Sequence, residues 1–400
     1  MSETKHNNQA DPIVIVSVAR TPMAAFQGDF ATLTAPQLGA IAIEAAVQRA
    51  GLKPEQVDEV VMGCVLPAGL GQAPARQAAL GAGLPLSTGS TTVNKMCGSG
   101  MRAAMFAHDM LAAGSVDVIV AGGMESMTNA PYLLPKARGG YRMGHGEVLD
   151  HMFYDGLQNP YDGALMGNFA DATARKYNFS RAQQDAYAAE SVRRALLASE
   201  SGAFSDEIVA VTVKSRKGEQ LVERDEPPFA CDISKIPQLK PAFGKDGTVT
   251  AASSSSIADG AAALILMSES ALRAANVTPL ARVLAYASHA HAPEWFTTAP
   301  AGAIQRVLQA ADWRTEDVDL FEINEAFAIV TMAAMSELAL PHEKVNVNGG
   351  ACALGHPIGA SGARILVTLL HALRARKLQR GIASLCIGGG EATAIAIEAV

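Results

Sequence analysis

Short apolar runs alternate with segments of helical spacing along the first third of the chain. Residues 13–18 (IVIVSV) form an uninterrupted apolar, β-branched run, which is typical of a central strand. Helical spacing follows at 38–50, a second strand is predicted at 57–65, and a short Ala-rich helix at 75–83. This alternation predicts an α/β fold, in which a sheet with much parallel pairing is covered by helices on both faces.

The segment from 93 to 125 combines a cysteine with the best-defined helix of this region. Cys97 lies in a glycine turn, a helix is predicted at 99–113, and a strand at 116–120 is closed by Gly122 and Gly123. The partial positive charge at the start of a helix favours a thiolate, which makes Cys97 a candidate nucleophile. A buried structural cysteine is an equally good interpretation of this segment alone.

The regular pattern is interrupted in the middle of the chain. Prolines, glycines and mixed charges dominate 128–257, where one clear helix is predicted at 181–199, and long excursions of this kind usually serve an active site. Strands and helices resume at Gly260. The predicted units are a disordered tail (1–11), an N-terminal half (12–127), a loop domain whose last part returns to that half (128–257), and a C-terminal half (258–400).

The end of the chain resembles its first third. Val93-Asn94 matches Val345-Asn346, and Ser99-Gly100-Met101-Arg102 matches Ser361-Gly362-Ala363-Arg364. An internal duplication explains this similarity, with each half supplying one sheet. Two such halves packed face to face would bring together Cys97 and His356, which occupy equivalent turns before a helix.

Composition and charge exclude several classes of protein. A net charge of −7 without a basic stripe argues against nucleic acid as a partner. The five cysteines are scattered and odd in number, which favours a reducing, cytoplasmic location over a disulfide framework. No apolar run is long enough to cross a membrane, and the polar start lacks a signal pattern.

Three further positions carry candidate chemistry. His356 lies in a turn fixed by Gly355 and Pro357, where it could take a proton from Cys97, although a lone histidine is more often structural. Cys386 ends an apolar strand, followed by glycines whose N–H groups could hold an oxyanion; a packed strand cysteine is the alternative. Asn324 could cap a helix or hold a water molecule. The cysteine and histidine spacing does not favour zinc, and no metal site is predicted.

Four motifs in order resemble the signature blocks of the thiolases. They are CGSG at 97–100, NEAF at 324–327, GGACALGHPIGASG at 349–362 and CIGGG at 386–390. The resemblance extends from about residue 12 to residue 400. It implies the duplicated α/β thiolase fold with layered sheets and helices, and a loop domain that binds coenzyme A and makes the contacts of a homotetramer, a dimer of dimers.

The resemblance also implies a role for each catalytic position. Cys97 would accept the acyl group, and His356 would be the base that activates Cys97. Cys386 would remove or return the α-proton of the second acyl group. Asn324, through an ordered water, and His356 would stabilise the enolate oxygen. The backbone N–H groups of Cys97 and Gly388 would hold the thioester oxyanion.

Coenzyme A is expected as substrate and product, and no other cofactor is implied. The positions that match its contacts in the family are Leu157, Met166, Phe243, Ala251, Ser255, Ala326 and Phe327. The sequence departs from the family pattern nearby. Residues 250–256 read TAASSSS where relatives have an Asn-rich block, Pro227 follows Asp225-Glu226 where many have a basic residue, and Leu165 replaces a common histidine.

The expected activity is the reversible condensation of two acetyl-CoA to acetoacetyl-CoA and CoA through an acetyl-Cys97 intermediate. The principal alternative is a 3-ketoacyl-CoA thiolase of broader chain length acting in fatty-acid degradation. A decarboxylating β-ketoacyl synthase and a lipid-binding or scaffolding protein without activity are more distant alternatives. The joint presence of Cys97, His356, Cys386 and Asn324 argues against the non-enzyme.

Overall fold

The structure of the chain is a computed structural model that describes residues 11–215 and 218–400. The predicted tail lies outside the described residues except for Asp11. That residue is held in place, because its carboxylate accepts a hydrogen bond of 3.2 Å from the backbone N–H of Ser270.

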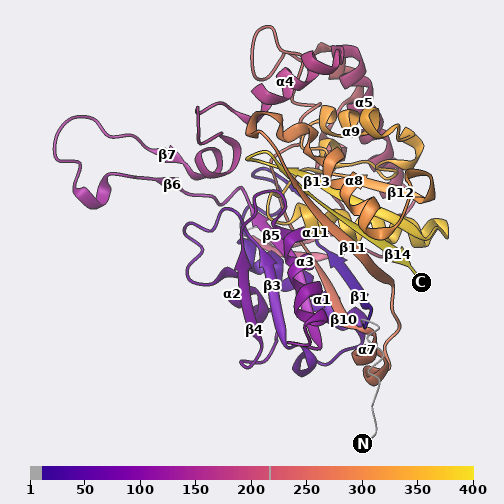
Figure 1. Ribbon diagram of the computed structural model, residues 1–400. Helices are drawn as coiled ribbons and strands as arrows, with labels where there is room; N and C mark the ends of the chain where they lie inside the picture. The colour runs from indigo at the N-terminus through magenta and orange to yellow at the C-terminus, as the bar shows by residue number, and fades with distance from the viewer. Residues whose placement is uncertain (1–10, 216–217) are drawn as a thin grey trace, which may run out of the picture.

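One long mixed sheet runs through the molecule and consists of two equivalent halves (Figure 1). The strand order β1-β10-β5-β3 in the first half is repeated as β11-β14-β13-β12 in the second, and β4 extends the first half beyond β3. The strands of the first half are β1 (Ile13–Arg20), β10 (Ala258–Ser268), β5 (Val118–Ser126), β3 (Glu59–Gly63) and β4 (Gly89–Val93). Those of the second are β11 (Ala281–Ala290), β14 (Glu391–Ala399), β13 (Arg380–Ile387) and β12 (Leu320–Ile323). The repeated order confirms the predicted duplication.

The two halves are joined by a short pairing of β1 with β11, which covers Val14 with Arg282 and Ile15 with Ala281. Parallel pairing is confined to β3 with β4 and β5, and to β12 with β13; the other pairs of this sheet are antiparallel. Parallel pairing is therefore present but less extensive than the alternation of strands and helices predicted. A strand buried on both faces shows the same apolar run in either direction, so its pattern does not reveal that direction.

Helices and sheet halves alternate in five layers. The outer face of the first half is covered by α1 (Ala35–Ala50) and α2 (Pro74–Gly81). The central layer contains α3 (Ser99–Ala112) and α11 (Ser361–Arg376), which share one buried cluster with both sheet halves. The helix α8 (Ala299–Ala311) covers the outer face of the second half. Cys97 and His356 both precede helices of the central layer.

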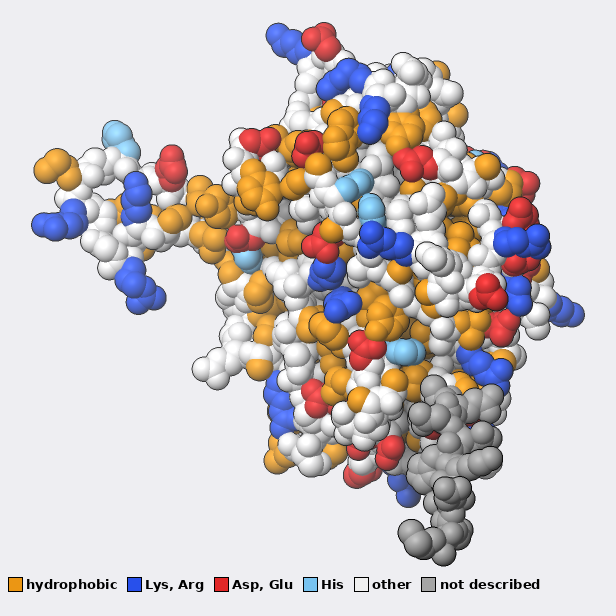
Figure 2. All heavy atoms as spheres, viewed as in Figure 1, with side chains coloured by type: hydrophobic (Ala, Val, Ile, Leu, Met, Phe, Trp, Pro, Cys, Tyr) orange, Lys and Arg blue, Asp and Glu red, His pale blue; other side chains and the backbone are white. Residues whose placement is uncertain are grey.

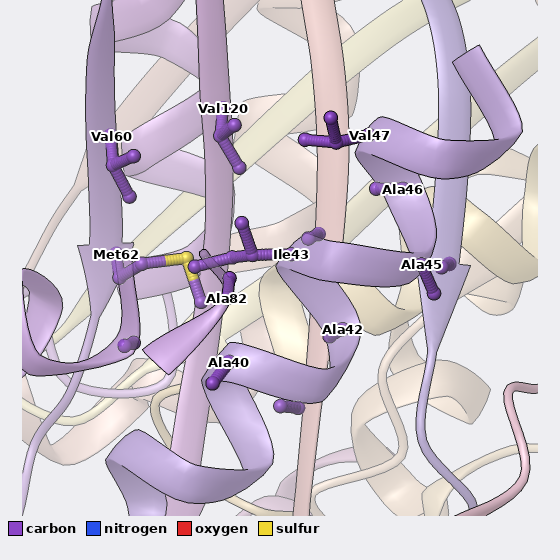
Figure 3. Close-up of a cluster of buried hydrophobic side chains, with 14 of the residues drawn as sticks. Ala40, Ala42, Ile43, Ala45, Ala46, Val47, Val60, Met62, Ala82 and Val120 are labelled. Carbon is purple, nitrogen blue, oxygen red and sulfur yellow. The ribbon is translucent and has the colours of Figure 1, made fainter. Parts of the chain in front are cut away.

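The Ala-rich sequence of α1 lets this helix lie close to the sheet. Figure 3 shows Ile43 and Val47 of α1 directed toward Val60 and Met62 of β3 and Val120 of β5. Burial of such side chains contributes about 1.5–3 kcal/mol each. The helix ends at Gly51, which adopts the left-handed conformation with φ 68°.

Two predicted boundaries require correction. Strand β5 does not stop at its glycine pair but continues to Ser126. A Cβ on Gly123 would lie 2.1 Å from the carbonyl oxygen of Gly359, so this glycine allows close approach of the turn after His356. Strand β10 pairs with β1 and β5. It therefore belongs to the sheet of the N-terminal half, although the predicted division at 257/258 assigns it to the other half.

The excursion between β5 and β10 contains more structure than the sequence predicted. Besides the expected helix α5 (Arg181–Glu200) it contains α4 (Met166–Tyr177) and a π-helical turn, η3 (Met152–Leu157). A projecting arm carries β6 (Tyr132–Leu133) and β7 (Leu149–Asp150), and it stands clear of the body in Figures 1 and 2. The hairpin β8 (Val211–Ser215) and β9 (Gly218–Val222) packs on the first half.

The remaining elements are short or flank the site. They are β2 (Ala24–Ala25), α6 (Pro227–Ala230), α7 (Glu269–Ala275), α9 (Ala328–Leu338) and α10 (Ala351–Leu354). Among the described residues, no helix combines the length and apolar character needed to cross a bilayer.

Candidate active site

A cavity of about 250 Å³ lies where the excursion meets the turns before α3 and α11. Cys97, His356 and Gly388 line it together with mainly apolar side chains. Six of the seven positions predicted to contact coenzyme A also line it, namely Leu157, Met166, Phe243, Ser255, Ala326 and Phe327. Ala251 does not line this cavity; it is exposed and borders a separate groove with Ala252 and Ser256.

The turn that presents Cys97 is held by side chains from its own sequence. Asn94 Oδ1 accepts a hydrogen bond of 2.9 Å from the N–H of Met96, and Ser99 Oγ accepts one of 2.8 Å from the N–H of Lys95. Met96 has a φ of 48°, which costs a non-glycine residue roughly 1–3 kcal/mol. The surrounding hydrogen bonds maintain this strained conformation, which places Cys97 at the cavity wall before α3.

The thiol of Cys97 is not acidic in this environment. Burial raises its pKa to about 11, and the negative charge of Glu125 also raises it, while the N–H groups of Gly388 and of Cys97 itself lower it. The predicted stabilisation of the thiolate by the helix terminus is therefore outweighed by desolvation. Cys97 needs a base to become a nucleophile.

His356 has the tautomer of a general base. Its Nδ1 is hydrogen-bonded to Ser361 Oγ, and that hydroxyl in turn donates to the carbonyl oxygen of Pro357 at 2.9 Å. Because the single hydroxyl proton of Ser361 is used for Pro357, Nδ1 must carry the imidazole proton. Nε2 is then a lone-pair acceptor, and it is buried without a partner in a residue that lines the cavity. The sequence predicts Ser361 only as the start of a helix.

We expect the neutral state of His356 to make stability depend on pH. Burial and the charge of Arg364 lower its pKa from 6.5 to about 3. The unfolded chain therefore binds more protons between these values, and the free energy of unfolding falls as the pH drops through this window. The free energy of unfolding, measured in urea, should fall between about pH 7.5 and about pH 5. We expect this fall to be about 2 kcal/mol larger in the natural protein than in His356→Gln.

His145→Gln, on the exposed arm, is the matched control and should show the same loss as the natural protein. An identical pH dependence in His356→Gln and the natural protein would contradict a buried neutral histidine.

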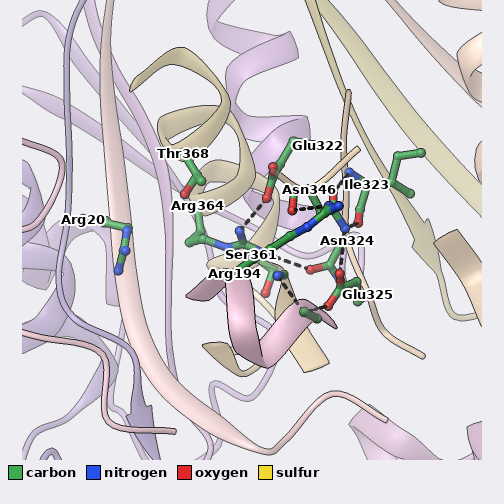
Figure 4. Close-up of polar contacts among 12 residues, drawn as sticks. Arg20, Arg194, Glu322, Ile323, Asn324, Glu325, Asn346, Ser361, Arg364 and Thr368 are labelled. Carbon is green, nitrogen blue, oxygen red and sulfur yellow. Dashed lines mark hydrogen bonds and ion pairs between the residues drawn. The ribbon is translucent and has the colours of Figure 1, made fainter. Parts of the chain in front are cut away.

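Asn324 follows β12 and is completely buried behind the cavity wall formed by Ala326 and Phe327. Its backbone N–H donates to the carbonyl oxygen of Ser384 in β13 at 3.0 Å. Its Oδ1 accepts a hydrogen bond of 3.3 Å from Arg364 Nη2 (Figure 4). Nδ2 is left as a buried donor without a partner, which suits the predicted contact with a water molecule.

Cys386 is the penultimate residue of the neighbouring strand β13 and is also completely buried. It packs in one hydrophobic cluster with Ala326, Phe327 and Phe296. Burial raises the pKa of its thiol, and the negative charge of Cys97 raises it further. The shared site of Cys97 and Cys386 stays a prediction.

Gly388 follows Cys386 in the turn between β13 and β14. Its N–H faces the sulfur of Cys97, and this contact lowers the pKa of that thiol. Gly389 and Gly390 have φ values of 98° and 89°, which favour glycine. The turn thus directs a backbone donor into the cavity, where a developing oxyanion would lie.

Two buried carboxylates near the site were missed in the sequence. Glu125, at the end of β5, accepts hydrogen bonds from the N–H groups of Val65 (2.9 Å), Leu66 (3.1 Å) and Gly359 (2.9 Å). It ties the turn after His356 to the N-terminal half, and burial raises its pKa to about 7. An acidic residue inside an apolar strand was the signal that could have found it.

Glu325 connects the site with the excursion. Its carboxylate accepts hydrogen bonds from Tyr187 (2.9 Å) and Ser191 (2.7 Å) of α5, and from Asn346 (2.9 Å). The NEAF motif predicted a role for Asn324 but none for this glutamate. Its contacts hold α5 against the loop that carries Asn324.

The departures from the family pattern form ordered structure, in which the Oγ of Ser256 is buried without a partner. Ser253 Oγ accepts from the N–H of Thr250 at 2.8 Å, and Ser255 Oγ donates to the carbonyl oxygen of Ala326 at 3.0 Å. Asp225, which precedes Pro227 by two positions, forms a buried ion pair with Arg20 at 2.7 Å. Within residues 11–215 and 218–400, no group of three or more His, Cys, Asp or Glu is arranged to hold a metal ion.

Comparison with known proteins places this geometry in a family. The family Thiolase, N-terminal domain, matches residues 13–270, and Thiolase, C-terminal domain, matches residues 277–399. The chain is 51% identical to an acetyl-CoA acetyltransferase of Escherichia coli over 96% of this chain and 98% of that protein. It is 47% identical to one of Cupriavidus necator over 96% of this chain and 99% of that protein.

Solved structures agree with these matches. The crystal structure of a Bacillus anthracis acetyl-CoA acetyltransferase has a TM-score of 0.96 and 42% identity, covering 98% of this chain and 99% of that one. A thiolase from Ascaris suum in complex with coenzyme A has a TM-score of 0.92 and 41% identity, covering 97% of this chain and 100% of that one. The duplicated sheet, the two cysteines, the histidine turn and these similarities agree, and the chain belongs to the thiolase family.

Proposed function

We propose that the protein catalyses the reversible condensation of two acetyl-CoA molecules to acetoacetyl-CoA and CoA. The observation that carries the proposal is the unpartnered Nε2 of His356 in the cavity that Cys97 and the Gly388 turn also line. The relatives named acetyl-CoA acetyltransferase, at 47% to 51% identity, support acetyl-CoA as the substrate.

In the first half-reaction, His356 Nε2 takes the thiol proton of Cys97, whose sulfur attacks the thioester carbonyl of acetyl-CoA. The N–H groups of Cys97 and Gly388 hold the oxyanion of the tetrahedral intermediate. The bond to the CoA sulfur then breaks, and the CoA thiolate takes the proton from His356. The products are acetyl-Cys97 and free CoA.

In the second half-reaction, the thiolate of Cys386 removes an α-proton from a second acetyl-CoA. Asn324 Nδ2, through a water, stabilises the enolate oxygen, and His356 contributes only while its Nε2 carries a proton. The enolate carbon attacks the carbonyl of acetyl-Cys97, and the carbon–sulfur bond to Cys97 breaks. The leaving Cys97 thiolate takes the proton that Cys386 had accepted, which restores both groups and releases acetoacetyl-CoA.

Aromatic side chains support a short acyl group. Phe327 contacts Phe243 and Phe296 edge to face, with ring centroids 5.9 Å and 6.4 Å apart, and all three line the cavity. For thiolysis with CoA, we expect kcat/KM to fall roughly tenfold or more between acetoacetyl-CoA and straight-chain 3-oxoacyl-CoA substrates beyond four carbons.

The same series separates the alternatives. A flat or rising profile of kcat/KM would favour a 3-ketoacyl-CoA thiolase of broader chain length. Absence of turnover with every substrate of the series would favour a binding protein.

We further propose a homotetramer and a cytoplasmic location, with coenzyme A as substrate and without a resident cofactor. The exposed apolar side chains of the arm support assembly, since Tyr132, Leu134 and Met143 are 68%, 53% and 95% exposed. The scattered cysteines, which are all free, are compatible with a reducing compartment.

A further inference from the structure

Arg364 is a buried cation that the mechanism above does not use. It lies on α11, one turn after Ser361, and is only 1% exposed. A buried guanidinium is costly unless its environment compensates the charge and its hydrogen bonds. Its neighbours therefore indicate what it does.

Both partners of Arg364 lie at the end of β12. Nη1 donates to Glu322 Oε1 at 3.0 Å, and Nη2 donates to Asn324 Oδ1 at 3.3 Å (Figure 4). Glu322 and Asn324 are two positions apart along an extended segment, so their side chains point to the same face of the sheet. The contact with Glu322 anchors one nitrogen of the guanidinium, and the second nitrogen is then directed at the amide.

This contact decides how the Asn324 amide is oriented. Arginine has only donors, so the atom of Asn324 that faces it must be Oδ1. Nδ2 must then point away from Arg364, where it has no partner. If the amide were rotated by half a turn, Nδ2 would face the guanidinium. Oδ1, an acceptor, would then take the place of the unpartnered donor Nδ2.

We propose that Arg364, held by Glu322, is a positioning residue that presents Asn324 Nδ2 as the donor for the enolate oxygen. The inference rests on the proposed function, in which Asn324 acts through water on the second half-reaction. It assigns no contact between Arg364 and the substrate. Replacement of Arg364 by lysine keeps the positive charge that lowers the pKa of His356, so it should slow enolate formation and leave acetylation of Cys97 intact.

The test compares the two half-reactions in Arg364→Lys, Arg364→Met, Glu322→Gln and Asn324→Ala. Single-turnover transfer of labelled acetyl from acetyl-CoA to Cys97 reports the first, and kcat of acetoacetyl-CoA formation reports the complete cycle. Arg364→Lys retains the charge for Glu322 but has a single ammonium group in place of the two-pronged guanidinium. It therefore remains informative if Arg364→Met does not fold.

For Arg364→Lys we expect kcat to fall roughly 10- to 100-fold, below the 10²- to 10³-fold cost of removing an oxyanion donor outright. The rate of Cys97 acetylation should stay within about twofold of the natural protein. In the Asn324→Ala background the same substitution should lower kcat almost no further, because the amide that Arg364 orients is then absent. Arg374→Met, an exposed position on α11, is the control and should leave both rates unchanged.

Two results would overturn the inference while leaving the proposed function intact. One is an equal fall of acetylation and kcat in Arg364→Lys; the other is an undiminished effect of Arg364→Lys in the Asn324→Ala background. Absence of acetyl-Cys97 in the natural protein would instead overturn the proposed function and the inference with it.

Discussion

Replacing Cys97 with serine is expected to lower kcat for acetoacetyl-CoA formation by about 10⁴-fold or more. Loss of an attacking nucleophile has cost about 10⁶-fold in a well-studied hydrolase. A hydroxyl is far harder to deprotonate than a thiol, and the burial that already raises the pKa of Cys97 would disfavour an alkoxide still more. Acetoacetyl-CoA formation and single-turnover labelling with acetyl-CoA measure the effect.

Cys231→Ser provides the matched control. Cys231 is half-buried and does not line the cavity, so its replacement should leave kcat unchanged. Retention of full activity in Cys97→Ser, or label that remains on the protein after this substitution, would assign the acyl group to another residue.

Replacing Cys386 with alanine is expected to separate the two half-reactions. Acetyl transfer to Cys97 should persist, because the attacking sulfur, His356 and the Gly388 turn are all retained. Condensation should fall roughly 10²- to 10⁴-fold, the usual contribution of a positioned acid or base, because the α-proton of the second acetyl-CoA then lacks its acceptor. Exchange of label between acetyl-CoA and CoA reports acetylation, and acetoacetyl-CoA formation reports condensation.

A direct probe of the same step is exchange of the acetyl α-protons with deuterated water, which should be lost in Cys386→Ala. The substitution removes one buried sulfur from a packed cluster, so a parallel thermal unfolding measurement shows whether the fold is retained. Equal loss of acetylation and condensation in a folded variant would contradict the assignment of Cys386 to proton transfer.

The sequence by itself determined the elements and the main chemical groups. Apolar, β-branched runs such as 13–18 became buried strands, and the Ala-rich segments became helices, because burial and periodicity decide these locally. The repeated residues around Ser99 and Ser361 revealed the duplication before any coordinates. Four ordered motifs then pointed to the thiolases, and six of the seven predicted acyl-CoA positions line one cavity.

Other features depend on contacts between distant segments, and only the tertiary structure decided them. The direction of β10, and its place in the first sheet half, depend on pairing across a long excursion. Gly123 reads as a strand end in the sequence, yet it allows the turn at Gly359 to approach β5. A local pattern contains no information about such a partner.

The electrostatics of the site belong to this second group. The sequence placed Cys97 at a helix terminus, but the apolar walls of the cavity raise the pKa of its thiol. The tautomer of His356 follows from the hydroxyl of Ser361, and the orientation of the Asn324 amide follows from Arg364. The pKa of a thiol and the orientation of an amide depend on all the neighbours that folding brings together. Residue types and spacing therefore named the reacting groups, while the packed structure set their protonation and orientation.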